Sequence, residues 1–206
     1  MVEKSSGAQN VYREKRVRLF VAIELPEFVK EALSELQTEI RQSGFPAKWS
    51  AAENIHLTLM FLGETPVSRV EDIGRQLADA AAGFPPITLW AAGLSVFPGV
   101  KRPRVLWTGV RGETDRLSRL QNRVEDNLSA IGFNKEDRGF TPHLTLARFK
   151  GKIDPETVIS AITCYGDFAS RDFRAGALCL FESRLTPRGA VYTCRQTHLL
   201  AGRAEE

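Results

Sequence analysis

Residues 56–59 read His-Leu-Thr-Leu, and the same four residues recur at positions 143–146, 87 residues later. In an extended strand, side chains two positions apart point to the same face. Each copy therefore directs its imidazole and its hydroxyl to one side and its two leucines into a core. Two such strands facing each other across a cleft would place two imidazoles and two hydroxyls around one small anion. The repeat predicts an acid–base site that uses neither a metal nor a cofactor.

The segments around the two motifs recur in the same order, which indicates an internal duplication of about 90 residues. Displaced by 87 residues, the apolar run 19–23 falls on the run 106–110, and both are typical of strands. Apolar residues spaced by three and four predict a helix over 27–43 and a second one over 115–131. An ordered series of strand, helix and motif strand is unlikely to recur by chance.

Helix boundaries repeat as well. Gly44 and Gly132 lie where the first helix of each half would end. Residues 68–71, Ser-Arg-Val-Glu, predict a capping box at the start of another helix. Its counterpart is Asp154 followed by Pro155, an N-cap with proline at the first helical position.

These patterns predict an α+β fold with two pseudo-symmetric lobes of antiparallel sheet and flanking helices around a central cleft. Residues 1–16 are expected to be a flexible lead-in, 17–200 a single two-lobed domain, and 201–206 a tail. The turn cluster 97–103 is expected to mark the crossover between the lobes. The expected strands are 17–24, 55–62, 87–97, 104–110, 143–149, 173–182 and 190–198, and the expected helices are 27–43, 68–82, 115–131 and 154–163.

The composition is that of one globular protein, with 43% apolar and 26% charged residues in a chain of 206. No apolar run approaches the roughly 20 residues of a membrane span, and no secretory leader opens the chain. We therefore expect a cytoplasmic monomer without a membrane partner. Cys164, Cys179 and Cys194 lack a CxxC spacing, so reduced thiols are expected rather than a zinc site. The net charge of +3 permits a polyanionic partner without requiring one.

Four stretches of sequence accompany the paired motif, at 18–26, 49–64, 140–148, and 180–183 with 189–192. Together they resemble the two-histidine phosphoesterase superfamily, and within it the RNA 2′,3′-cyclic phosphodiesterase family, historically called 2′-5′ RNA ligases. The resemblance covers residues 18 to about 200. It implies hydrolysis of RNA 2′,3′-cyclic phosphate ends to 2′-phosphates, with a slow reverse reaction as a 2′-5′ ligase.

The motif residues suit this chemistry. An attacking water must lose a proton while the departing sugar oxygen gains one on the opposite side of the phosphate. Imidazole, with an ordinary pKa near 6.5, serves both tasks, so His56 and His143 are the predicted catalytic pair. Thr58 and Thr145 are predicted to donate hydrogen bonds to the non-bridging oxygens. Neither motif contains aspartate or glutamate, so no ligands for Mg²⁺ are evident.

The two histidines have different roles in the family. The resemblance implies that His56 protonates the leaving 3′ oxygen and that His143 activates water. The sequence itself is symmetric on this point, so both assignments stay open.

Two residues near the second motif are further candidates for substrate binding. Phe140 could provide a stacking face for a base or could pack in the core. Arg148 would fall on the opposite face from His143 in a regular strand. It is therefore either part of a structural ion pair or a phosphate ligand brought to the site by a bend.

A basic cluster is the remaining candidate. Arg102 and Arg104, together with Lys101 and Arg138, could hold an RNA backbone or could form a solvated loop. His198 has no threonine two positions later, and a surface or packing role is expected for it.

Two alternatives to an RNA phosphodiesterase remain. The same machinery could act on a small cyclic nucleotide, such as ADP-ribose cyclic phosphate, because only the walls of the cleft would differ. The chain could also be a non-catalytic RNA- or nucleotide-binding module. Intact histidine and threonine in both motifs weigh against that interpretation, since binding alone does not need both acid–base groups.

Overall fold

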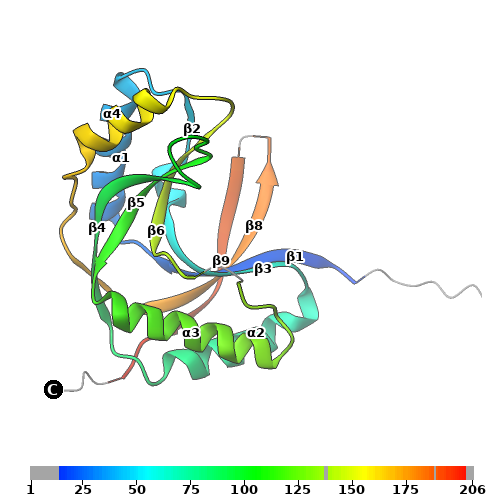
Figure 1. Ribbon diagram of the computed structural model, residues 1–206. Coiled ribbons are helices and arrows are strands. Elements are labelled where there is room, and N and C mark those ends of the chain that lie inside the picture. The colour runs from blue at the N-terminus through cyan, green and yellow to red at the C-terminus, as the bar shows by residue number, and fades with distance from the viewer. Residues whose placement is uncertain (1–13, 137–138, 188, 203–206) are drawn as a thin grey trace, which may run out of the picture.

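The computed structural model describes residues 14–136, 139–187 and 189–202 (Figure 1). Arg138, most of the predicted lead-in and residues 203–206 of the predicted tail lie outside these ranges. The elements are β1 (Arg16–Glu24), α1 (Glu27–Gln42), β2 (Ala47–Trp49), η1 (Ala52–Asn54), β3 (His56–Pro66), η2 (Val67–Arg69), α2 (Val70–Ala81), β4 (Ile87–Phe97), β5 (Val105–Gly112), α3 (Thr114–Ala130), β6 (His143–Phe149), α4 (Pro155–Tyr165), β7 (Phe173–Ala175), β8 (Ala177–Thr186) and β9 (Gly189–Leu199).

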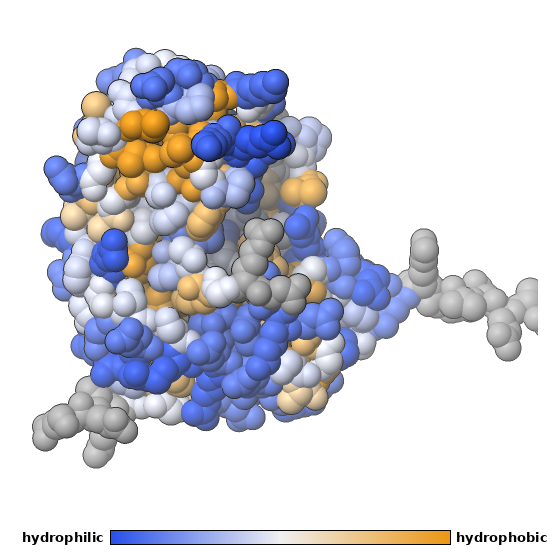
Figure 2. All heavy atoms as spheres, in the orientation of Figure 1, coloured by the Kyte–Doolittle hydropathy of each residue, from blue (hydrophilic) through white to orange (hydrophobic). Residues whose placement is uncertain are grey.

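The strands form two antiparallel sheets, in the orders β3-β1-β8-β9 and β2-β6-β5-β4-β7. Helices α2 and α3 lie below the first sheet in Figure 1, and α1 and α4 lie beside the second. This arrangement confirms the predicted α+β fold of two lobes. In Figure 2 the hydrophilic residues gather on the lower face, over α2 and α3, as expected for amphipathic helices that cover a sheet.

The two lobes are related by the duplication, but each half of the chain contributes to both. The order β3-β1-β8-β9 has its counterpart in β6-β5-β4-β7. Strand β4 ends the first half of the sequence and yet pairs with β5, whereas β8 returns to pair with β1. The turn 98–104 therefore joins two strands of one sheet, so the prediction of a crossover between lobes at 97–103 is wrong. The chain passes from the first sheet to the second between α2 and β4. It also enters the second sheet briefly at β2, and it returns to the first between β7 and β8.

Several boundaries differ from expectation. The single strand expected over 173–182 is two strands, β7 and β8, separated by Gly176. Strand β2 was not predicted, because three residues are too few to show a period. The capping box predicted at 68–71 is also wrong. Helix α2 follows the 3₁₀ turn η2, its N-cap is Arg69, and no side chain caps it. Arg16, the last residue of the predicted lead-in, is the first residue of β1.

Glycine ends the first helix of each half, as predicted. Gly44 and Gly132 adopt φ angles of 78° and 93°, in the left-handed region that glycine tolerates without strain. After α3 two backbone hydrogen bonds end the helix. The N–H of Gly132 donates to the oxygen of Ser129, and the N–H of Phe133 donates to the oxygen of Leu128. Asp154 is the N-cap of α4 and Pro155 its first residue, which confirms the position of the other predicted boundary, although the side chain of Asp154 makes no capping hydrogen bond.

Most of the core is one large cluster that includes residues of both sheets, and a second, smaller cluster consists of Phe20, Ala22, Cys179 and Phe181. All four motif leucines belong to the large cluster, and Leu57 and Leu144 are completely buried, as the alternation predicts. Burial of each such side chain stabilises the fold by about 2 kcal/mol. The polar half of each motif is thereby turned away from the core. None of the helices in the described ranges is long and apolar enough to cross a membrane.

Candidate active site

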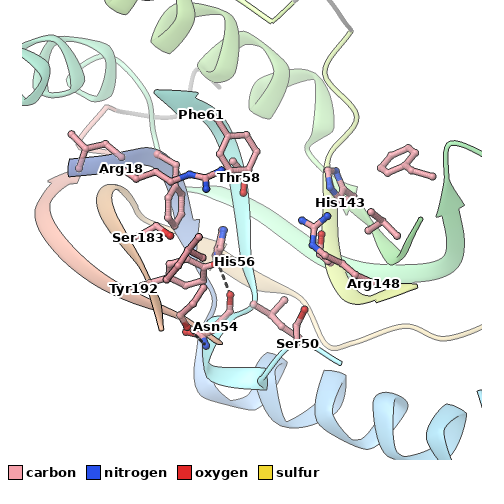
Figure 3. A pocket seen from close by; sticks show the side chains of 18 residues that line it. Arg18, Ser50, Asn54, His56, Thr58, Phe61, His143, Arg148, Ser183 and Tyr192 are labelled. Carbon is pink, nitrogen blue, oxygen red and sulfur yellow. Dashed lines mark hydrogen bonds between the residues drawn. The ribbon is translucent and has the colours of Figure 1, made fainter. Parts of the chain in front are cut away.

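Both motif strands line a single cleft of about 730 Å³. In Figure 3 the two histidines lie on opposite walls, one in β3 and the other in β6. The residues that the two strands contribute are His56, Thr58 and Phe61 from β3, and His143, Thr145 and Arg148 from β6. The structure thus brings the four motif side chains together around one space.

The two imidazoles are oriented in the same way. His56 Nδ1 lies 2.8 Å from the backbone oxygen of Asn54, two residues earlier. His143 Nδ1 lies 2.8 Å from the backbone oxygen of Thr141, also two residues earlier. A carbonyl oxygen only accepts hydrogen bonds, so each Nδ1 must carry the proton. Each Nε2 is then free to accept a proton, or to donate one when the ring is charged.

Burial lowers the pKa of both imidazoles. The pKa of His56 falls from 6.5 to about 4, because burial outweighs the bond to Asn54, and charge on His143 lowers it further. The pKa of His143 is also lowered, first by burial and then by the positive charge of Arg148, although the bond to Thr141 opposes the shift. Both rings are therefore neutral at pH 7 in the free protein, and a bound anion would favour protonation of either.

A β-bulge interrupts each motif strand at the same place. Val21 pairs with Met60 and Ala22 with Thr58, which leaves Leu59 without a partner. In β6 the equivalent register shift leaves Leu146 unpaired between Thr145 and Ala147. A bulge adds one residue to one strand and reverses the alternation beyond it.

The bulges decide which residues reach the cleft. Beyond the bulge, Phe61 and Arg148 return to the face that carries the histidines, and both line the cleft. A regular strand would turn Arg148 away from His143, but this strand is not regular. The bulge supplies the bend that one of the two alternatives for Arg148 required. In Figure 3 the guanidinium of Arg148 lies on the His143 side of the cleft.

Aromatic rings pack around each histidine. Phe20 stacks on His56 with ring centroids 4.6 Å apart, and Tyr192 meets the same ring edge-on at 5.1 Å. On the other wall, Phe97 meets His143 edge-on at 5.0 Å. These rings supply the burial that depresses the two pKa values, and they limit the rotation of the imidazoles.

Sequence reasoning missed several residues of the cleft. Arg18 lines it from β1 and brings a second positive charge, on the same side as Thr58 in Figure 3. Ser183 lines it from β8, and Phe61 lies beyond the bulge of β3. Arg18, Ser183 and Tyr192 belong to the flanking stretches that carry the family resemblance, which was the available signal. Phe61 also lies in one of these stretches, but its orientation towards the cleft could not be predicted without knowledge of the bulge.

The remaining candidates lie outside this cleft. Phe140 and Arg104 line an adjoining pocket of about 680 Å³ that shares Thr58 and His143 with the cleft. Arg102 lines a different pocket of about 640 Å³, next to the start of α4. Arg138 lies outside the described residues, and His198 lines neither the cleft nor these pockets.

Potential metal ligands are not gathered in the described ranges, where no group of three or more histidine, cysteine, aspartate or glutamate side chains could hold an ion. The cleft combines two imidazoles and two guanidinium groups with several hydroxyls, among them those of Thr58 and Thr145. That set of groups suits an anion whose reaction requires proton transfer on two sides.

Comparison with known proteins identifies this arrangement. The model of the LigT-like phosphoesterase family matches the chain twice, over residues 23–107 and 109–192, so both halves of the duplication match it. A Thermotoga maritima protein named RNA 2′,3′-cyclic phosphodiesterase is 36% identical over 177 residues, which cover 85% of this chain and 91% of that protein. A protein of the same name from Aeropyrum pernix is 35% identical over 160 residues, covering 78% and 90%.

Solved structures share the fold. TT0787 of Thermus thermophilus superposes with a TM-score of 0.75 at 29% identity, covering 91% of this chain and all of that one. E. coli LigT complexed with 3′-AMP superposes with a TM-score of 0.69 at 26% identity, covering 90% and 99%. The two-lobed fold, the doubled family match and the relatives agree, and the chain belongs to the LigT-like phosphoesterase family.

Proposed function

We propose that the protein hydrolyses the 2′,3′-cyclic phosphate ends of RNA to 2′-phosphates, without a metal ion. The observation that carries this proposal is the pair of imidazoles on opposite walls of one cleft, each oriented by the same backbone bond. Relatives from several organisms are named RNA 2′,3′-cyclic phosphodiesterase, which supports the choice of substrate.

The proposed reaction is one in-line displacement at phosphorus. Nε2 of one histidine takes a proton from water, whose oxygen forms a bond to phosphorus. The bond from phosphorus to the 3′ oxygen breaks, and that oxygen takes a proton from Nε2 of the other histidine. Thr58 and Thr145 donate hydrogen bonds to the non-bridging oxygens, and Arg148 stabilises their charge. The product is a 2′-phosphate beside a free 3′-hydroxyl.

His143 is the proposed base and His56 the proposed acid. The positive charge of Arg148 disfavours the protonated form of His143 and keeps its Nε2 available to accept a proton. His56 has a pKa of about 4 in the free protein, so its protonation must accompany binding of the anionic substrate. In ligation a 5′-hydroxyl takes the place of water. His143 accepts its proton as the oxygen bonds to phosphorus, the bond to the 3′ oxygen breaks, and His56 protonates that oxygen, which leaves a 2′-5′ linkage in a slow reaction.

RNA beyond the reacting end is proposed to continue into the adjoining pocket. Phe140 offers a face for stacking a base, and Arg104 beside it can pair with a phosphate. Arg102 lies farther along the same hairpin and would contact a longer strand through its backbone. These contacts favour an RNA end over a mononucleotide as the substrate.

The direct test is hydrolysis of a short RNA with a 2′,3′-cyclic phosphate by protein treated with EDTA, with products separated as 2′- or 3′-phosphates. We expect full activity and only the 2′-phosphate. Loss of activity that returns with a divalent ion would contradict a metal-independent reaction. Tight binding of the RNA with no turnover would favour the binding-module alternative.

A small cyclic nucleotide is the second candidate substrate. A cleft of about 730 Å³ is the size of an ordinary small-ligand site. Comparison of kcat/KM for a nucleoside 2′,3′-cyclic phosphate, ADP-ribose 1″,2″-cyclic phosphate and an RNA of about ten nucleotides separates the candidates. The RNA should be preferred, and equal or better turnover of either small substrate would favour this alternative.

We also propose that the protein acts as a monomer in the cytoplasm. The described cleft is formed by the two lobes of one chain, so catalysis does not require a second copy. Sedimentation at catalytic concentrations should give the mass of one chain.

A further inference from the structure

Two buried glutamines reach the bulges of the motif strands. Gln37 of α1 and Gln121 of α3 are only 4% and 3% exposed. The Nε2 of Gln37 donates to the backbone oxygen of Leu146 at 2.8 Å, and the Nε2 of Gln121 donates to the backbone oxygen of Leu59 at 3.4 Å. The bulge that follows each motif threonine leaves Leu146 and Leu59, respectively, without a strand partner.

The amide of Gln37 also contacts the segment that leads to the first histidine. Its Nε2 donates a second bond, of 2.9 Å, to the backbone oxygen of Ser50. Ser50 lines the cleft and in turn donates its own backbone N–H to the oxygen of Leu146. Four residues later comes Asn54, whose carbonyl orients His56. One side chain therefore holds both the bulge before Arg148 and the segment that leads to the first histidine.

Burial of a glutamine is costly unless its amide is hydrogen-bonded, and an apolar residue would otherwise be the favoured occupant of these helix positions. Gln37 lies on the buried face of α1, among leucine, isoleucine and valine. Gln121 lies on the buried face of α3 in comparable surroundings. The carbonyl oxygens at the bulges explain why an amide donor is present on each of these faces.

We propose that Gln37 and Gln121 are positioning residues, which hold the two bulges so that Arg148 and Phe61 point into the cleft. This inference rests on the proposed function for the role of the cleft as a phosphate site. Gln37 makes two short bonds and Gln121 one long bond, so the effect is stronger on the wall that carries Arg148. Gln37 lines neither the cleft nor the adjoining pocket, so it acts through the bulged strand, whereas Gln121 also lines the adjoining pocket with Thr58 and His143.

Binding of inorganic phosphate, measured by calorimetry, tests the role of Gln37 independently of turnover. Gln37→Met keeps the length of the side chain but removes the amide. We expect it to weaken phosphate binding about tenfold, the effect of losing one hydrogen-bonded contact of about 1.4 kcal/mol. Arg148→Ala should weaken binding at least as much. In the double variant the loss should equal that of Arg148→Ala alone, because the glutamine acts through the arginine.

Ile40→Val is the matched control, since Ile40 is fully buried on the same helix. It should lower the unfolding temperature without changing phosphate affinity. Gln37→Asn, which is one methylene shorter, should give an intermediate loss and serves if Gln37→Met does not fold.

Three outcomes would overturn parts of the account. Losses that multiply in the double variant would show that Gln37 does not act through Arg148. Unchanged phosphate affinity in a folded Gln37 variant would remove the positioning role altogether. Failure of the unmodified protein to bind phosphate would instead contradict the proposed function, and with it the premise of the inference.

Discussion

At the scale of single residues, the backbone carbonyl two positions before each histidine is the decisive contact. It places the proton on Nδ1 and leaves Nε2 for chemistry, and it does so in both lobes. The paired motif predicted that these two histidines share one cleft, because only residue types and spacing were needed. It could not reveal the carbonyl contacts, since these depend on the path of the chain before each strand.

The assignment of acid and base can be tested with a substrate that needs no acid. An RNA end whose 3′ oxygen is replaced by sulfur has a leaving group that departs without a proton. His56→Ala should then recover most of its activity, whereas His143→Ala should stay at least about 10²-fold impaired. Single-turnover rates on the oxygen and sulfur substrates give the comparison. Recovery of His143→Ala instead would reverse the two roles.

The pH dependence of kcat/KM follows from the lowered pKa values. The productive free protein has one imidazole charged and the other neutral. Both pKa values lie below 6.5, and that of His56 is about 4, so above pH 6.5 both rings lose their protons. We expect kcat/KM to be greatest between about pH 4 and 6.5 and to fall as the pH rises further. The kcat profile should lie at higher pH, because the bound phosphate favours the protonated ring.

Measurement of initial rates from about pH 4 to 9, in buffers of constant ionic strength, checks this expectation. The motif alone would place the maximum near neutrality, and burial moves it downwards. A kcat/KM maximum at or above neutral pH would contradict the role of burial in setting these pKa values.

At the scale of elements, the strands and helices with a clear period were predicted closely, and irregular features were not. β4 and β6 occupy the predicted ranges, because alternation over 7 to 11 residues is a strong signal. The bulges at Leu59 and Leu146 were missed, although the adjacent buried pair Leu59 and Met60 breaks the alternation. A bulge is stabilised by partners from elsewhere in the chain, here Gln37 and Gln121, and a local pattern does not contain them.

The role of glycine at the end of α1 can be tested by measuring the free energy of unfolding. Gly44 has a φ of 78° and open space where a Cβ would be added, so Gly44→Ala introduces backbone strain without a clash. We expect a loss of about 1 kcal/mol in the free energy of unfolding. Gly99→Ala is the control, because Gly99 also has open space but no positive φ. Urea unfolding of both variants measures the difference, and equal stabilities would contradict the account of the helix end.

At the scale of the whole molecule, the duplication predicted two similar lobes but not the exchange of strands between them. The sequence halves meet at 97–104, where turn residues suggested a boundary, yet β4 and β5 pair within one sheet. Which strands pair across the duplication depends on long-range contacts that no local pattern encodes. The cleft between the motif strands could be predicted from the internal duplication alone.

The stability of the whole molecule should depend on the charge of His56. Its pKa is lower in the folded state than the value of 6.5 in the unfolded chain. Below pH 6.5 the unfolded state therefore binds more protons, so stability is full above 6.5 and is lost as the pH falls towards 4. The shift corresponds to about 3 kcal/mol between these limits. His56→Gln should remove this part of the pH dependence.

Unfolding in urea at about pH 7 and at about pH 4 gives the required free energies for both proteins. The unmodified protein should lose more stability than the His56→Gln variant over this interval. Equal losses would mean that His56 is not held neutral by the fold.

The central claim is that two imidazoles act together on one cyclic phosphate. Single-turnover hydrolysis of a 2′,3′-cyclic phosphate RNA should be measured, in EDTA, for the unmodified protein, His56→Ala, His143→Ala and the double variant. Each single variant should lose at least about 10²-fold, and the double variant should lose far less than the product of the two, because both groups serve one step. Near-normal activity in either single variant would contradict the claim.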